Sequence, residues 1–185
     1  MATRVQHGLT YDDYARFPDD GRRWELIDGE AFMVPTPSTD HQDILGRLHL
    51  IIGRYLETSG GGRVFFAPLD VIFAPHQVFQ PDVIFVSDAD TSVITQKNLQ
   101  GAPTWLIEVC SDPVRDKRVK RDVYARYGVR EYWIVDPELR NVEVHAKGLE
   151  PMIFSPPAKL APSVLPNLEI DVEEVLGPDL RPKRW

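Results

Sequence analysis

The stretch that decides the fold is TWLIEVCSDPVRDKRVKRDVYARYGVREYWIVD, residues Thr104–Asp136. It contains an apolar run with one carboxylate, Glu108, then a segment rich in Lys and Arg, then a second apolar run. Runs that are apolar on successive residues are typical of central strands covered on both faces. A carboxylate within such a strand is costly unless a metal, a cation or hydrogen-bond donors pair with it. Glu108 is therefore the first candidate functional residue.

A second apolar run, QPDVIFV at residues 80–86, carries another carboxylate, Asp82, near its start. If the two runs are neighbouring strands, Asp82 and Glu108 can hold a hard divalent cation such as Mg²⁺ through oxygen ligands. A water on such an ion can be activated to attack a phosphodiester. Alone, Asp82 would also suit a strand start, where a carboxylate accepts backbone hydrogen bonds.

The basic segment after Glu108 predicts a helix that ends at Gly128. Lys120 follows Asp116 by four residues and precedes Tyr124 by four, so these three side chains share one helix face. That face adjoins the apolar stripe, and Lys120 is therefore predicted to point along the sheet towards Glu108. The alternative is that Lys120 is one cation among several on a solvated face.

Length and composition are those of a globular α+β protein. A chain of 185 residues with 43% hydrophobic and 26% charged residues predicts a single domain, 1–185, with a core of about 36–146 and a proline-rich C-terminal extension, 147–185. Cys110 is the sole cysteine, which excludes an intramolecular disulfide and suits a reducing, cytoplasmic setting. No apolar run approaches the length of a membrane span, and no signal peptide is recognisable.

Charge gives a mixed indication about nucleic acid as a partner. The net charge of −7 weighs mildly against it, yet five of the seven residues from 115 to 121 are basic. Placement of charge matters more than its sum. A cluster of carboxylates that binds cations would also contribute to the acidic balance.

Periodicity and turn residues predict the other elements. The helices are a short one within 8–17, a long one from Thr39 or Asp40 to a glycine-rich turn, the basic helix, and a last helical turn in VEEVL. A hairpin is predicted at 23–35. A polar loop at 88–98 is long enough to be mobile or to lie across a site. The other strands are expected at 63–67, 69–74, 79–86, 106–110, 130–135, 141–146 and 152–155. The order predicts an α+β domain with a helix on each side of its sheet.

Several motifs in this order resemble a known family. They are WELIDGE, PTPSTDHQ, QPDVIFV, WLIEVCS followed by Asp116 and Lys120, and GVREYWIVDP. The chain, from about residue 9 to 176, is similar to the Uma-type putative restriction endonuclease family of bacteria, in the PD-(D/E)XK nuclease superfamily. The resemblance implies a restriction-endonuclease-like mixed β-sheet with an α/β-like core, flanked by helices, with an N-terminal helix and β-hairpin.

The resemblance also implies roles for residues. Asp82 matches the aspartate of PD, and Glu108 matches the acidic residue of (D/E)XK. The superfamily pattern places a lysine two residues after that acidic residue, where this chain has Cys110. In the Uma-type pattern the lysine comes from the following helix, which here is Lys120. Metal binding is expected from Asp82, Glu108 and the Val109 backbone carbonyl.

The function implied is a Mg²⁺-dependent (or Mn²⁺-dependent) endonuclease that hydrolyses DNA phosphodiester bonds by metal-activated water, acting as a homodimer. Glu25 and His41 lie in motifs of the family and are further catalytic candidates, and DNA phosphates are expected to meet the basic segment through Arg115, Lys117, Arg118 and Arg121. One alternative is a catalytically inactive nuclease-fold protein that serves as a dimeric nucleic-acid-binding or interaction module. Another is a hydrolase of a different phosphoester, which would share the metal chemistry.

Overall fold

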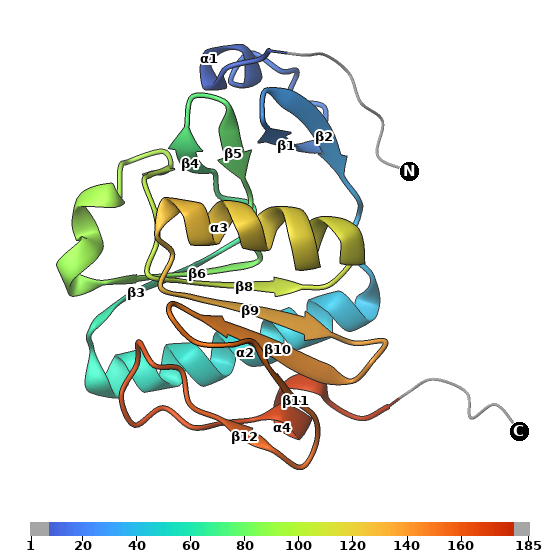
Figure 1. The fold of residues 1–185 in the computed structure, drawn as a ribbon, viewed down its shortest axis with the longest axis vertical. Helices are drawn as coiled ribbons and strands as arrows, with labels where there is room; N and C mark the ends of the chain where they lie inside the picture. The colour runs from blue at the N-terminus through green and yellow to red at the C-terminus, as the bar shows by residue number, and fades with distance from the viewer. Residues whose placement is uncertain (1–7, 180–185) are drawn as a thin grey trace, which may run out of the picture.

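A six-stranded mixed sheet runs through the centre of the molecule (Figure 1), in a computed structural model that describes residues 8–179. Its strand order is β11-β10-β9-β8-β6-β3. The central strand β8 pairs antiparallel with β6 and parallel with β9. The strands are β3 (Gly62–Phe66), β6 (Val83–Ser87), β8 (Trp105–Val109), β9 (Glu131–Asp136), β10 (Asn141–Ala146) and β11 (Met152–Phe154).

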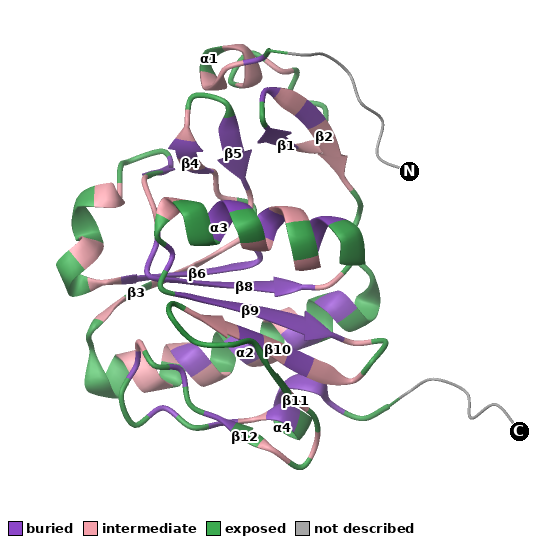
Figure 2. Ribbon diagram, viewed as in Figure 1, coloured by how far each residue is buried: buried purple, intermediate pink, exposed green. Residues whose placement is uncertain are grey.

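Helices cover both faces of this sheet, as predicted. Helix α2 (Thr39–Ser59) lies along one face and buries Ile44, Leu48 and Ile52 there. Helix α3 (Arg121–Tyr127) lies across the other face and buries Val123 and Tyr124. Successive side chains of a strand point to opposite faces, so the central strands need apolar residues at nearly every position. Figure 2 shows β6, β8 and β9 buried along their length.

A second sheet, in the order β2-β1-β5-β4-β7, stands beside the first. The predicted hairpin at 23–35 is confirmed as its β1 and β2. The predicted strand 79–86 is wrong as one element, because its start belongs to β5 in this sheet and the rest forms β6 in the other. Pro81, which lacks an N–H, marks the break. The strands are β1 (Arg23–Ile27), β2 (Glu30–Val34), β4 (Val71–Ala74), β5 (Gln77–Phe79) and β7 (Leu99–Gln100).

The helix after β8 is a composite of two helical forms. Its first part, η2 (Arg115–Lys120), is π-helical, and α3 continues from it to Gly128, which takes the left-handed conformation expected at a helix end. The π segment buries Arg115, Asp116 and Lys120. Widened helical turns of this kind are frequent at functional sites.

Smaller elements complete the fold. Helix α1 (Tyr11–Tyr14) is shorter than the predicted segment, and Ser38, rather than Thr39 or Asp40, caps α2. The predicted loop after β6 forms η1 (Asp88–Val93), a 3₁₀ helix, where Arg130 holds Asp90 with two hydrogen bonds. The C-terminal segment adds β12 (Lys159–Leu160), β13 (Ile170–Asp171) and α4 (Val172–Leu176).

The C-terminal segment packs on the α2 side of the sheet. Leu160, Ile170, Val172 and Val175 are buried in the same cluster as the α2 residues. The predicted extension is thus built into the core. Among the helices of residues 8–179, none combines the length and the apolar character that crossing a membrane requires.

Candidate active site

The two carboxylates lie beside each other, Asp82 directly before β6 and Glu108 on β8. Val83 pairs with Ile107, so the register brings Asp82 beside Glu108 one step further on. Both side chains lie on the sheet face that α3 covers, and both line a cavity of about 330 Å³. Asp82 is 6% and Glu108 4% exposed. The predicted proximity of these carboxylates is confirmed, with the difference that Asp82 lies one residue before β6 and not within it.

Lys120 reaches this pair from the helix. Its Nζ lies 2.8 Å from Glu108 Oε1, 3.0 Å from Glu25 Oε1 and 3.6 Å from Asp116 Oδ1. Its side chain is 5% exposed. The prediction that Lys120 points inward is therefore confirmed, and the alternative of a solvated face is wrong.

Glu25 comes to the site from the second sheet. It is fully buried on β1, and its Oε1 accepts a hydrogen bond from the Gln80 backbone N–H at 3.2 Å. The same oxygen meets the Lys120 ammonium, whereas Oε2 is buried without a hydrogen-bond partner in the described residues. The break at Pro81 thus lets one sheet supply Glu25 and the other supply Asp82 and Glu108.

His41 also reaches the site, from the first turn of α2. Its Nε2 lies 3.0 Å from Asp82 Oδ2, and that oxygen accepts a second hydrogen bond from the Val109 backbone N–H at 2.8 Å. Ser38 fixes the start of the helix by accepting a hydrogen bond from the His41 backbone N–H. These contacts hold Asp82 in one orientation.

Asp116 and Tyr124 belong to the site but were not among the residues predicted to form it. Asp116 Oδ2 accepts hydrogen bonds at 3.0 Å from the backbone N–H groups of Ser111 and Asp112, which fixes the turn after β8. The Tyr124 hydroxyl donates to Glu108 Oε1 at 3.0 Å. The signal was present in the sequence, because both residues are four positions from Lys120 on its helix face.

The basic segment does not form one surface. Arg115 is buried beside Glu25, and Lys117 donates to Asp136 at 2.7 Å. Arg121 pairs with its neighbour Asp122, and Arg118 is exposed. The four predicted phosphate contacts therefore occupy different environments, and of these four Arg115 alone lines the cavity.

The crowding of carboxylates shapes the electrostatics of the cavity. Burial raises the pKa of the Glu108 carboxyl well above its usual range, and the Asp82, Asp116 and Glu25 carboxylates raise it further, against the Lys120 charge. Burial alone would lower the pKa of Lys120, but Glu108, Glu25 and Asp116 together raise it above its usual value. Lys120 is therefore a fixed cation at neutral pH, and proton uptake neutralises Glu108 readily.

Two carboxylate oxygens remain available for a metal. Within residues 8–179, no hydrogen bond reaches Asp82 Oδ1 or Glu108 Oε2, whereas the other oxygen of each carboxylate is fully engaged. No group of three or more His, Cys, Asp or Glu suited to a metal occurs in those residues. A donor set of two carboxylates fits Mg²⁺, which keeps several waters and shares its coordination with substrate phosphates, and does not fit a closed zinc site.

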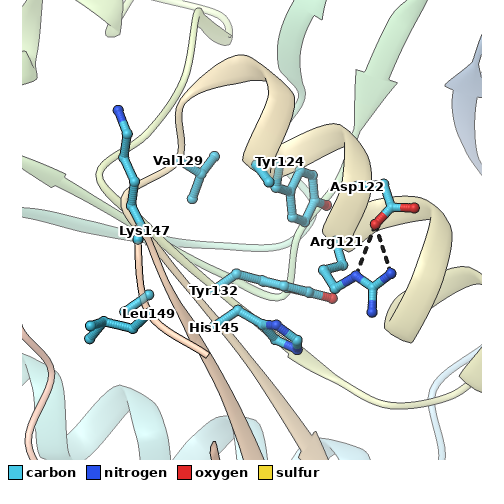
Figure 3. A pocket seen from close by; sticks show the side chains of 11 residues that line it. Arg121, Asp122, Tyr124, Val129, Tyr132, His145, Lys147 and Leu149 are labelled. Atoms are coloured by element: carbon cyan, nitrogen blue, oxygen red, sulfur yellow. Dashed lines mark hydrogen bonds and ion pairs between the residues drawn. The ribbon is translucent and has the colours of Figure 1, made fainter. Parts of the chain in front are cut away.

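A second cavity, of about 270 Å³, lies beside two buried tyrosines (Figure 3). Tyr124 and Tyr132 line it, and their hydroxyls point back to Glu108 and to the Asp116 backbone carbonyl. Arg121 and Lys147 also line it, whereas Glu25, Asp82 and Glu108 are not among the described residues that border it. The tyrosines thus separate it from the candidate site.

The fold and the site define a class of protein: a mixed α+β domain of restriction-endonuclease-like architecture with acidic residues on adjacent central strands. A family model described as a putative restriction endonuclease, Uma2, matches residues 11–173, and the chain belongs to this family. The family and the fold mark the chain as a nuclease-type protein, as the sequence motifs predicted.

A solved structure supports the same architecture. The chain is similar to a putative nuclease of DUF820 from Anabaena variabilis, with a TM-score of 0.77 and 22% identity over 91% of this chain and 97% of that one. At this identity the likeness shows the fold. Comparison with the curated proteins gives no match.

Proposed function

We propose that this chain is a Mg²⁺- or Mn²⁺-dependent endonuclease that hydrolyses DNA phosphodiester bonds. The observation that carries the proposal is the convergence of Asp82, Glu108 and Lys120 in one cavity. Membership of a restriction endonuclease family supports a nucleic-acid substrate. Buried ionisable groups gathered in a cavity, with shifted pKa values, are typical of catalytic sites.

The metal would be held by Asp82 through Oδ1 and by Glu108 through Oε2, with the Val109 carbonyl as a further ligand. A divalent cation supplies Lewis-acid polarisation of the phosphate and lowers the pKa of the attacking water. His41 and the Val109 N–H hold Asp82 in position through its other oxygen. Tyr124 does the same for Glu108. Such supporting contacts fix ligand orientation.

Lys120 would act as a charge and not as a base. Its raised pKa keeps the ammonium protonated, so it cannot accept the proton of the attacking water. An ammonium held by Glu108, Glu25 and Asp116 can instead stabilise the negative charge that develops on the phosphoryl oxygens. Glu25 and Asp116 then serve to position Lys120.

The decisive experiment is plasmid cleavage with Mg²⁺ or Mn²⁺ together with metal binding by calorimetry. Wild-type protein is compared with Asp82→Asn, Glu108→Gln and Lys120→Met, and with Glu174→Gln, an exposed control purified identically. Cleavage by the wild type and the control alone is expected. Equal cleavage by all variants would mean a contaminant. A wild type that neither cuts nor binds metal would overturn the proposal.

The alternative function is a non-catalytic nuclease-fold module that binds nucleic acid. The observation that favours it is Cys110 in the usual lysine position, combined with a net charge of −7. Such a module would bind a DNA duplex in a gel-shift assay without metal and without cleavage.

Cutting both strands of a duplex calls for two active sites, so the endonuclease is expected to be a homodimer. Analytical ultracentrifugation measures this oligomeric state directly.

A further inference from the structure

The cavity that holds the carboxylates contains a buried arginine with unused hydrogen-bonding capacity. Arg115 is 7% exposed, and its Nε and Nη1 are buried without a hydrogen-bond partner within the described residues. Its Nε lies 4.0 Å from Glu25 Oε2, too far for a hydrogen bond, and that oxygen has no partner either. A buried cation with unmade hydrogen bonds is costly, so Arg115 is held ready for a ligand.

A second arginine lines the same cavity from β1. Arg23 precedes Glu25 by two residues, so the two lie on the same face of the strand. Arg23 is half-buried and makes no hydrogen bond or ion pair inside the range 8–179. Arg115 and Arg23 thus approach the cavity from two different elements, η2 and the second sheet.

The lysine that lines the cavity is already committed. Lys120 is bound by Glu108, Glu25 and Asp116. Within the part of the chain that the structure describes, the two arginines are therefore cations of the cavity that no hydrogen bond joins to a carboxylate. A guanidinium offers its donors in a planar fork that matches the oxygens of a phosphate, which makes it the side chain best suited to this anion.

We propose that Arg115 and Arg23 form a subsite for a phosphoryl group of the nucleic-acid substrate. Arg115 supplies the deep contact to the non-bridging oxygens, and Arg23 supplies a second contact. This assignment rests on the proposed function, because the proposed nuclease activity is what makes the ligand a phosphodiester. It also changes the role expected for the basic segment, because Arg115 binds phosphate inside the cavity whereas Arg118 remains outside it.

The test uses inorganic phosphate as the probe and the metal-free full chain. Titration is followed through the Nε–H signals of the arginines in ¹H–¹⁵N spectra, and affinity is measured by calorimetry. The Arg115 and Arg23 signals are expected to shift, and the Arg118 signal to stay. Arg115→Gln should weaken phosphate binding at least about tenfold, as expected for the loss of a charge-assisted hydrogen bond, while Arg118→Gln leaves it unchanged.

Two results would overturn this assignment: an Arg115 signal that does not respond to phosphate, or equal phosphate affinity in Arg115→Gln and wild type. The wild-type spectra and Arg23→Gln decide the matter if Arg115→Gln fails to fold. Failure of the proposed function is a separate outcome, because phosphate binding is measured without metal or cleavage. Phosphate bound through Arg115 by a protein that never cuts DNA would keep the subsite and refute the nuclease.

Discussion

Lys120 Nζ lies 2.8 Å from Glu108 Oε1, although one side chain comes from the π-helical segment and the other from a central strand. This contact places an ammonium beside the strand carboxylate while Cys110 occupies the position two residues after Glu108. The helix thus supplies to the site a cation that the strand does not carry. Removing either partner tests both stability and function.

Substitution of Lys120 by Met should abolish cleavage and lower the free energy of unfolding by about 3 kcal/mol or more, because Glu108, Glu25 and Asp116 would be left buried without their shared cation. Chemical denaturation measures the loss. Lys117→Met is the matched control: Lys117 is 23% exposed and its loss leaves one carboxylate, Asp136, without a cation instead of three, so the destabilisation should be clearly smaller. Equal losses in the two variants would contradict a special role for Lys120.

Substitution of Glu108 by Gln should remove metal binding yet stabilise the metal-free fold at neutral pH. The pKa of Glu108 is raised in the folded state, so its carboxyl favours folding below its unfolded pKa, and that contribution is lost as pH rises through the folded-state pKa. Gln does not titrate and can still accept from Lys120 and Tyr124. The gain in melting temperature should therefore grow with pH and vanish in acid.

A melting temperature of Glu108→Gln that stays below that of the wild type throughout the neutral range would argue against this reading of the site. Metal binding by the wild type should strengthen with pH for the same reason, since Glu108 must lose its proton before it can act as a ligand. Calorimetry in buffers of different ionisation enthalpy measures the protons released. An exposed carboxylate variant, Glu174→Gln, should show neither effect.

His41→Ala should weaken metal affinity and cleavage by about 10- to 100-fold, while Asp82→Asn removes a ligand and should abolish both. His41 touches the site through Asp82 Oδ2, so its loss frees the carboxylate to rotate, although the Val109 N–H still holds that oxygen. Initial rates at varied Mg²⁺ separate weaker metal affinity from a lower maximal rate. High Mg²⁺ is expected to restore the cleavage rate of His41→Ala. If His41→Ala cleaves as fast as the wild type at low Mg²⁺, His41 does not position Asp82 for metal binding.

Cys110 should behave as an inert thiol. Burial, with the Asp116 and Asp136 carboxylates nearby, raises its pKa to about 12, so the thiolate is scarce at pH 8. Alkylation of the native protein should be about a hundredfold slower than that of the unfolded chain, as mass spectrometry can follow. Cys110→Ala should keep plasmid cleavage, because the ammonium comes from Lys120; loss of cleavage with an intact fold would show that Cys110 itself is needed.

Local patterns predicted most of the elements because their cause is local. The two-residue turn of the hairpin, the helical repeat of α2 and the apolar runs of β8 and β9 all follow from neighbouring residues. The strand predicted at 79–86 failed because it joined Phe79 and the apolar run from Val83 across the Gln80-Pro81-Asp82 break, while the two parts pair with strands of different sheets. Pairing partners are long-range contacts that a local pattern does not contain.

By itself, the sequence determined that Asp82 and Glu108 are carboxylates in apolar runs, where burial is costly without a partner, and that Lys120 shares a helix face with Asp116 and Tyr124. These follow from residue type and spacing. Only the tertiary structure decided that Glu25 meets them from a second sheet and that Arg115 is buried beside it with unmade hydrogen bonds. The reason is physical: desolvation and charge pairing depend on which distant segments share a cavity, and packing of the whole chain sets that.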